Sequence, residues 1–252
     1  MNTPAQIAAG FADLGEKKAA LPRGKAFLLA ILAGMFIAFA GVGATIGGAV
    51  AGRLAGACIF PAGLAMVVVA GSELFTGDNL MIVSLLEKRI SVGALFLTLL
   101  IVYIGNFAGS WLVALLTVSG GTLGAFAENV VSAAAAKASL GFGEALLRGI
   151  LCNILVCIAV WMAAAAQTPG GKIGSLYGPI MVFVLCGFEH CVANMYYLPA
   201  GIMASSRYGI AAEGLTWGAA IFRNLLPVTL GNMIGGFAVG LAYWTAYLRK
   251  KA

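Results

Sequence analysis

The sequence predicts an all-α integral membrane protein with six membrane-spanning helices, built as two three-helix units of opposite orientation. The first observation is composition: 62% of the 252 residues are hydrophobic and 10% are charged, too little polar surface to cover a soluble globule. The second is a series of charge-free runs near the roughly 18 residues that a spanning helix needs. The third is that two of these runs are interrupted by glycines and ionisable residues.

Residues 1–24 precede the first apolar run and are predicted to form an amphipathic helix on the cytoplasmic face of the membrane. Thr3 and Pro4 suit the cap and the first turn of a helix. Three apolar residues then fall on one helical face: Ile7, Phe11 and Leu14. Acidic residues are mixed into this segment, so we expect no cleaved signal peptide. A loosely ordered terminus is the alternative.

The remainder of the chain, residues 25–252, holds the six predicted spans: 25–52, 56–87, 91–118, 143–167, 173–204 and 217–248. Spans two and five are interrupted, by 71-GSELFTGDNLM-81 and by Glu189-His190.

The distribution of Lys and Arg predicts that both termini are cytoplasmic. With that orientation ten basic residues are cytoplasmic: Lys17, Lys18, Arg23, Lys25, Lys88, Arg89, Lys172, Arg249, Lys250 and Lys251. Five are external: Arg53, Lys137, Arg148, Arg207 and Arg223. The net charge of +6 is therefore mostly a feature of topology, and no basic patch indicates a nucleic-acid partner.

Three local matches indicate that residues 25–118 and 143–248 are repeats. Gly34 aligns with Gly149, 71-GSE-73 with 187-GFE-189, and 105-GNFAG-109 with 231-GNMIG-235. Three spans per unit force the two copies into opposite orientations. Paired interruptions in such an inverted repeat point to a substrate site near the membrane midplane.

The residues at the two interruptions suit an anion site. Ionisable side chains at membrane depth indicate function by default, and helices starting near Asp78 or Asn194 would turn positive N-terminal ends inward. For Glu73 and Glu189, a pore role and a capping or pairing role remain equally open. The five cysteines lie in apolar segments and predict no disulfide framework, and a single histidine argues against a metal site; no cofactor is expected.

Four segments resemble the formate/nitrite transporter family, whose members conduct formate, nitrite or hydrosulfide. They are 73-ELFTGDN-79, 151-LCNILVCIAVWM-162, 187-GFEHCVANM-195 and 224-NLLPVTLGNMIGG-236. The resemblance covers essentially the whole chain. It implies an aquaporin-like protomer fold and a homopentamer in the cell membrane, surrounded by lipid, with a pore in each protomer.

The resemblance also implies roles for individual residues. His190 corresponds to the central histidine of the family, Thr76 to the threonine of the interrupted second span, and Lys137 to a lysine in the outer vestibule. Asn153 and Asn232 correspond to amides around the histidine. Two apolar constrictions are matched by Phe60, Leu64, Phe75 and Phe183. The role of Asp78 is not assigned by the resemblance.

The predicted function is conduction of small monovalent anions of weak acids, with formate preferred and nitrite or hydrosulfide as alternatives. A bare anion would meet a large desolvation barrier at the apolar constrictions. Lys137 and polar donors would lower it, or the anion would cross as the neutral acid, with His190 in a proton relay; the second route is favoured. The competing classes are an aquaporin-like neutral-solute channel, an intramembrane enzyme and a structural scaffold. An enzyme is not expected, because no nucleophile motif is present.

Overall fold

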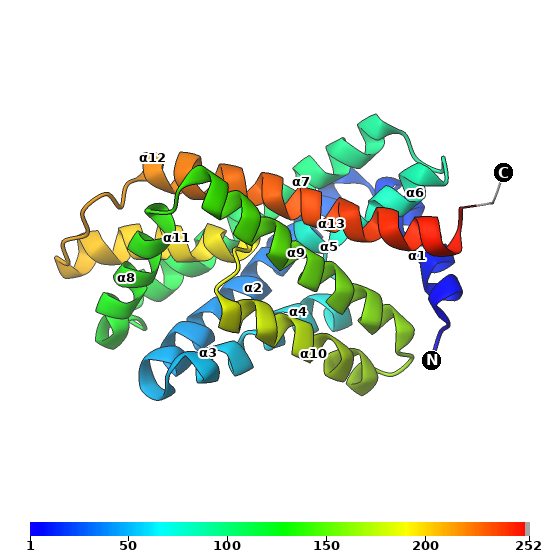
Figure 1. Cartoon of the computed structure of the whole chain (residues 1–252). Helices are drawn as coiled ribbons and strands as arrows, with labels where there is room; N and C mark the ends of the chain where they lie inside the picture. The colour runs from blue at the N-terminus through cyan, green and yellow to red at the C-terminus, as the bar shows by residue number, and fades with distance from the viewer. Residues whose placement is uncertain (250–252) are drawn as a thin grey trace.

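The computed structural model describes residues 1–249, and these residues form helices joined by short connections (Figure 1). Lys250 and Lys251, which the orientation argument counts as cytoplasmic, lie outside the described residues. The helices of the first half are α1 (Pro4–Ala19), α2 (Arg23–Ala51), α3 (Arg53–Ile59), α4 (Pro61–Ala70), α5 (Phe75–Asp78), the 3-10 turn η1 (Asn79–Met81), α6 (Ile82–Leu86) and α7 (Val92–Ser119).

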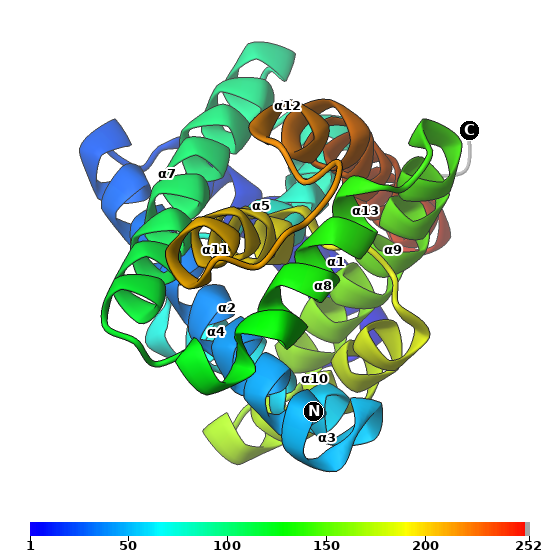
Figure 2. The ribbon, with the colours of Figure 1, turned by 90° about the vertical axis from the view of Figure 1, so that its left-hand side faces the viewer.

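The second half begins with the 3-10 turn η2 (Gly124–Phe126) and α8 (Ala127–Ala138), which the sequence did not predict. The other elements are α9 (Phe142–Ala165), α10 (Pro169–Cys186), α11 (Cys191–Tyr208), α12 (Trp217–Ala219), the π-helical segment η3 (Ala220–Leu225) and α13 (Leu226–Tyr247). Seen from the end where α8 lies, α11 runs through the interior of the bundle with other helices around it (Figure 2).

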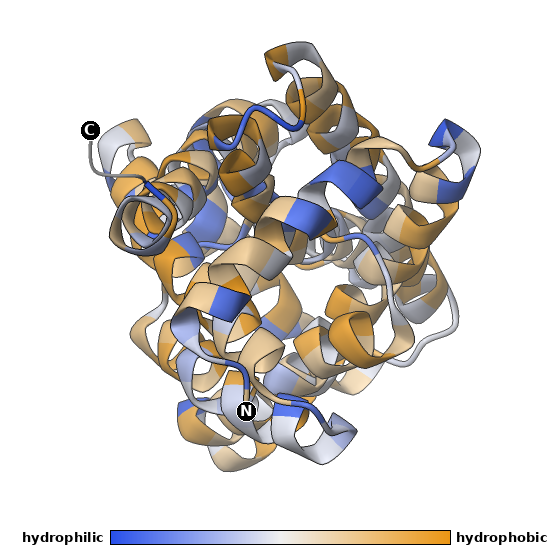
Figure 3. Cartoon of the chain, turned by 90° about the vertical axis from the view of Figure 1, so that its right-hand side faces the viewer, coloured by the Kyte–Doolittle hydropathy of each residue, from blue (hydrophilic) through white to orange (hydrophobic). Residues whose placement is uncertain are grey.

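The helices identify a multi-pass membrane protein. Five helical segments are long and apolar enough to cross a membrane: Arg23–Ala51, Arg53–Ala70, Val92–Ser119, Phe142–Ala165 and Trp217–Tyr247. The pair α10 and α11, bent by 48°, makes a sixth if it crosses as one span. The ribbon is mostly hydrophobic, with short hydrophilic stretches (Figure 3). Large apolar side chains such as Leu28, Leu100 and Leu147 are exposed on it, which suits contact with lipid.

Two left-handed glycines end the helices that lead into the breaks. Gly71 caps α4 with φ of 78°, and Gly187 caps α10 with φ of 71°. A side chain with a Cβ is strained in this conformation, whereas glycine adopts it freely. The two interruptions therefore begin with the same local geometry.

Matched glycine contacts hold the long helices together in both halves. A Cβ on Gly109 of α7 would lie 2.0 Å from the carbonyl oxygen of Ile31 in α2. A Cβ on Gly235 of α13 would lie 2.3 Å from that of Ile150 in α9. Only glycine permits such close approach of two backbones, so α2 packs on α7 in the same way as α9 packs on α13.

The backbone contacts of the breaks correct one detail of the proposed alignment. The N–H groups of Glu73 and Glu189 donate to the carbonyl groups of Leu29 and Arg148, at 3.4 and 3.2 Å. Gly149 is therefore level with Ala30, the residue after Leu29. The alignment of Gly34 with Gly149 was wrong by one helical turn, because small residues recur every turn on these closely packed helices.

The N-terminal helix forms as its sequence indicates, but its apolar face packs on the protein. Thr3 and Gln6 make the reciprocal hydrogen bonds of a capping box. Phe11 is 6% exposed and stacks on Trp161 of α9, with ring centroids 5.1 Å apart. Ser84 donates to the carbonyl of Ala12 at 2.8 Å. In Figure 1, α1 and α8 lie at opposite ends of the bundle.

Candidate functional site

Two cavities enter the helical bundle from different sides. The α1-side cavity, about 370 Å³, is lined by residues of α1, α4, the first break and α9. The α8-side cavity, about 480 Å³, is lined by residues of α2, α3, α8, α10 and the second break. They share no lining residue: Leu64 lines the first, and Phe60, one turn earlier, lines the second. His190 lines the α8-side cavity, whereas Thr76 lines neither cavity.

A hydroxyl and an imidazole meet at the wall of the α8-side cavity. Thr76 of α5 and His190, the residue before α11, are 0% and 3% exposed, and Thr76 Oγ1 lies 3.0 Å from His190 Nε2. The first break supplies one side chain and the second break the other. The structure thus brings together two residues that the family resemblance selected from distant parts of the chain.

The second ring nitrogen of His190 is occupied. Its Nδ1 accepts a hydrogen bond from the backbone N–H of Ala193 at 3.0 Å, so that the side chain caps α11. A neutral ring with an accepting Nδ1 carries its proton on Nε2 and donates it to Thr76 Oγ1. A doubly protonated ring would direct Nδ1–H against the N–H of Ala193. This geometry disfavours the expected relay through His190, because a relay requires the imidazolium.

The two predicted amides hold backbone groups. Asn232 donates to the carbonyl groups of Gly149 and Glu189 at 2.8 and 2.9 Å and accepts from the N–H of Cys191. Asn153 donates to the carbonyl groups of Thr76 and Asn232 at 3.2 and 2.6 Å. Both amides therefore fix the breaks beside the histidine, and the N–H groups of Asn232 are already engaged.

Asn106 does the same for the first break, although the resemblance did not assign it a role. It donates to the carbonyl groups of Ala30 and Glu73 at 2.8 and 2.9 Å and accepts from the N–H of Phe75. The signal in the sequence was its position in GNFAG, equivalent to Asn232 in GNMIG.

The four predicted constriction residues separate into three positions. Phe60 and Phe183 meet edge to face on the α8-side cavity, with centroids 5.6 Å apart, and Phe183 also stacks on His190 at 5.8 Å. Leu64 lines the α1-side cavity together with Leu74, which sequence reasoning missed. Phe75 lines neither cavity, and its ring packs on Tyr103 of α7 at 5.0 Å.

Glu189 and Lys137 form a one-to-one ion pair on the α8 side. Glu189 Oε1 lies 2.8 Å from Lys137 Nζ. Its Oε2 accepts from the amides of Asn194 and Asn224 at 2.6 and 3.1 Å. Both oxygens of this buried carboxylate are satisfied, which is the pairing role that the sequence left open.

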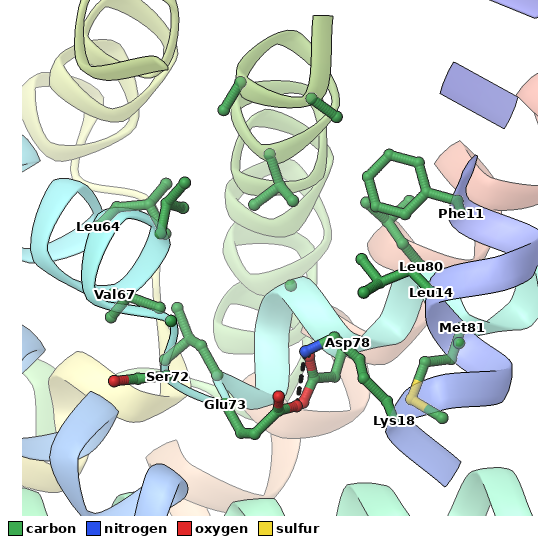
Figure 4. A pocket seen from close by; sticks show the side chains of 18 of the residues that line it. Phe11, Leu14, Lys18, Leu64, Val67, Ser72, Glu73, Asp78, Leu80 and Met81 are labelled. Carbon is green, nitrogen blue, oxygen red and sulfur yellow. Dashed lines mark hydrogen bonds and ion pairs between the residues drawn. The ribbon is translucent and has the colours of Figure 1, made fainter. Parts of the chain in front are cut away.

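Glu73 forms part of a different cluster on the α1 side. Lys18 of α1 reaches Glu73 at 2.5 Å and Asp78 Oδ1 at 2.9 Å, so two carboxylates share one ammonium (Figure 4). Burial lowers the pKa of Lys18, but the nearby charges of Asp78 and Glu73 outweigh it and raise that pKa to about 12. Asp78 Oδ2 is buried and has no hydrogen-bond partner among residues 1–249.

The charges that line the two cavities differ. Arg53, Lys137 and Arg148 line the α8-side cavity with a single carboxylate, that of Glu189. Lys18 and Lys172 line the α1-side cavity with two carboxylates, those of Glu73 and Asp78. Within residues 1–249, no group of three His, Cys, Asp or Glu side chains is placed to hold a metal ion.

Comparisons with known proteins show which family the chain resembles. The family model described as "Formate/nitrite transporter" matches residues 5–245. The formate channel FocA of Escherichia coli strain K12 is 39% identical over 98% of this chain and 95% of its own length.

Two solved structures extend the likeness to the fold. A pentameric formate channel with formate bound has a TM-score of 0.79 at 34% identity, covering 90% of this chain and 98% of that one. An FNT family ion channel has a TM-score of 0.86 at 30% identity, covering 95% and 98%. These relatives are membrane channels, and the match extends over nearly the whole chain. The chain belongs to the formate/nitrite transporter family.

Proposed function

We propose that this protein is a channel for formate and similar small anions of weak acids, with one pore in each protomer. The observation that carries the proposal is the buried contact between Thr76, which lines neither cavity, and His190, which lines the α8-side cavity. The E. coli relative is a formate channel, and one structural neighbour is a formate channel with formate bound.

In this proposal the pair recognises the substrate by donated hydrogen bonds. His190 Nε2–H donates to Thr76 Oγ1, which leaves the threonine hydroxyl proton free to donate to a substrate oxygen. Phe60, Phe183 and Leu64 exclude water on either side of the pair. An anion crossing these apolar groups loses its hydration, so the neutral acid crosses at lower cost.

The same proposal covers assembly and topology. The likeness to a pentameric channel supports a homopentamer. The matched contacts of Asn106 and Asn232 support a six-span inverted repeat with 25–118 and 143–248 as its halves, and residues 1–24 as a separate segment. We place the α1 end in the cytoplasm, because most Lys and Arg residues of the sequence fall on that side.

The test is anion flux through the purified protein in liposomes. We expect formate to pass faster than through protein-free liposomes, with nitrite and hydrosulfide as comparison anions. Swelling assays with water and glycerol serve as the control for a neutral-solute channel. Flux of glycerol but no flux of any of the three anions would refute the proposal.

The role of the central pair is tested with two variants. His190→Asn keeps a hydrogen-bond donor, whereas His190→Phe removes it. We expect formate flux to fall about a hundredfold in His190→Phe and by about tenfold in His190→Asn, typical of a lost or displaced buried donor. Equal flux in both variants and in the wild type would exclude the histidine from the permeation path.

A further inference from the structure

A neutral His190 has no proton to exchange with the permeating acid. The ring already uses Nδ1 to accept from Ala193 and Nε2 to contact Thr76. A neutral imidazole in this arrangement donates a hydrogen bond but has no second proton to give. A titratable group elsewhere along the path can take up or supply the proton that His190 does not.

Asp78 has the geometry of such a group. Its Oδ1 is paired with Lys18, while its Oδ2 is unpartnered among residues 1–249 and the side chain is buried in the wall of the α1-side cavity. Figure 4 shows the carboxylates of Asp78 and Glu73 next to the Lys18 side chain, with Leu64 and Val67 on the facing helix. A buried oxygen without a donor is costly, and a proton or a hydrogen-bond donor from a ligand removes that cost.

The net charge of the cluster also favours proton binding. With both carboxylates ionised, the cluster of Lys18, Glu73 and Asp78 carries a net charge of about −1, and two carboxylates sharing one site favour the uptake of one proton. The other charged group on the cavity wall is Lys172 of α10. Two further titratable groups lie on elements packed around α5: Cys157, which contacts the Thr76 carbonyl, and Tyr103, which faces Phe75.

We propose that Asp78 is a proton-binding site at the α1 end of the pore, where the weak acid and its anion interconvert. An acid molecule that leaves the apolar passage breaks its O–H bond, and the proton bonds to Asp78 Oδ2. The electron pair stays on the substrate, which leaves as the anion, and Asp78 then releases the proton to water. In the opposite direction the Asp78 carboxyl protonates an incoming anion. This inference rests on the proposed function and names the proton acceptor within it.

The direct test is infrared titration of the purified protein between about pH 5 and pH 8. We expect a band of a protonated carboxylic acid that disappears as the pH rises. Asp78→Asn should lack the band, while its amide oxygen still accepts from Lys18 and keeps α1 docked. Glu73→Gln should keep the band but lose it at lower pH, because the neighbouring negative charge is gone. Glu16→Gln, which removes an exposed carboxylate from the same helix as Lys18, is the matched control and should behave as the wild type.

The functional test measures labelled formate and a trapped pH indicator in liposomes. Wild-type flux should carry protons with formate, and Asp78→Asn should lower that coupled flux at least about tenfold at neutral pH, with a flatter pH profile. Asp78→Ser repeats the test with a smaller side chain. If wild-type protein conducts no formate, the proposed function fails, whereas the infrared result stands by itself. If formate flux is present and Asp78→Asn keeps the wild-type band and pH profile, this inference alone is overturned.

Discussion

Two buried lysine–glutamate contacts occupy corresponding places at the breaks, yet they are built differently. Lys137 of α8 has one carboxylate partner, Glu189, whose second oxygen is held by Asn194 and Asn224. Lys18 of α1 has two carboxylate partners, Glu73 and Asp78, and one oxygen of Asp78 is unpaired among residues 1–249. The first arrangement has balanced charge and both of its carboxylate oxygens are hydrogen-bonded, although Asn194 Oδ1 has no partner among residues 1–249, so its carboxylate favours one conformation. The second has one more negative charge than its lysine offsets, so it is suited to bind and release a proton.

The largest expected effect is a loss of stability, and we expect it to differ between the two clusters. Glu189→Leu leaves the Lys137 ammonium without its carboxylate and removes one of the acceptors of Asn194 and of Asn224, and we expect a loss of about 4 kcal/mol in the free energy of unfolding. Glu73→Leu leaves Lys18 paired with Asp78, and we expect a loss of about 1 kcal/mol. Thermal unfolding in detergent, followed with a thiol-reactive dye, measures both, because Cys152, Cys157 and Cys191 are buried. Similar losses would show that the two clusters are equivalent.

The next effect concerns the asparagine that holds the backbone of each break. Asn106→Ala and Asn232→Ala each remove an amide that bonds three backbone groups, two at a break and one on the neighbouring helix α2 or α9. Each should cost about 3 kcal/mol, because buried N–H and carbonyl groups lose their partners. The same dye assay compares them. A difference well beyond 1 kcal/mol would mean that the breaks are held unequally, despite their matched contacts.

A third effect is the dependence of α1 docking on pH. The pKa of Lys18 is raised from 10.5 to about 12, so its pairing stabilises the docked helix fully below about pH 10.5 and is lost as the pH rises through 12. The shift corresponds to about 2 kcal/mol. Trp161 fluorescence reports the transition, since Phe11 of α1 stacks on that ring. Lys18→Met is the control and should show no transition attributable to this lysine.

The smallest effect concerns anion capture on the α8 side. Arg53 lines the cavity and has no carboxylate within ion-pair distance among residues 1–249, whereas Lys137 is already paired. Arg53→Gln should lower formate flux at low formate concentration by about threefold, and high salt should abolish the difference. Lys137→Gln should reduce flux at any salt concentration, because it unpairs the buried Glu189. A salt-dependent loss of flux in Lys137→Gln alone would instead support the vestibule role predicted for that lysine.

The sequence allowed prediction of features that depend on local pattern. The amphipathic N-terminal helix with its Thr3 cap, the long apolar helices and the interruptions at 71–81 and at Glu189-His190 follow from spacing, capping residues and glycine. The family resemblance also selected Thr76 and His190, which meet in the structure. Each of these depends on neighbouring residues or on a specific motif.

Features that depend on tertiary contacts were missed. One example is the pairing of Lys18 with Asp78. The sequence assigned the helix of Lys18 to the membrane surface, but this ion pair connects that helix to a buried residue of the first break. The helix α8 has a short, alanine-rich sequence that gives no spanning signal. Phe75 is apolar and lies in the ELFTG motif, which predicted a constriction, but its ring packs on Tyr103. Periodicity reports which face of a helix is apolar, and it does not report whether lipid, protein or a cavity covers that face.

The π-helical segment Ala220–Leu225 has a consequence for how this chain tolerates insertions and deletions. It contains Asn224, whose amide bonds the carbonyl of Lys137 and the carboxylate of Glu189. A π-turn holds one residue more than an α-turn, and each residue of an α-helix rotates the chain by about 100°. Deletion of a single codon in this segment would convert it to an ordinary α-helix and turn Asn224 away from Glu189. A reading-frame-preserving loss of one residue, harmless in a surface loop, would here remove the Asn224 contacts with Lys137 and Glu189 and leave Asn232 as the polar link between the last membrane helix and the second break.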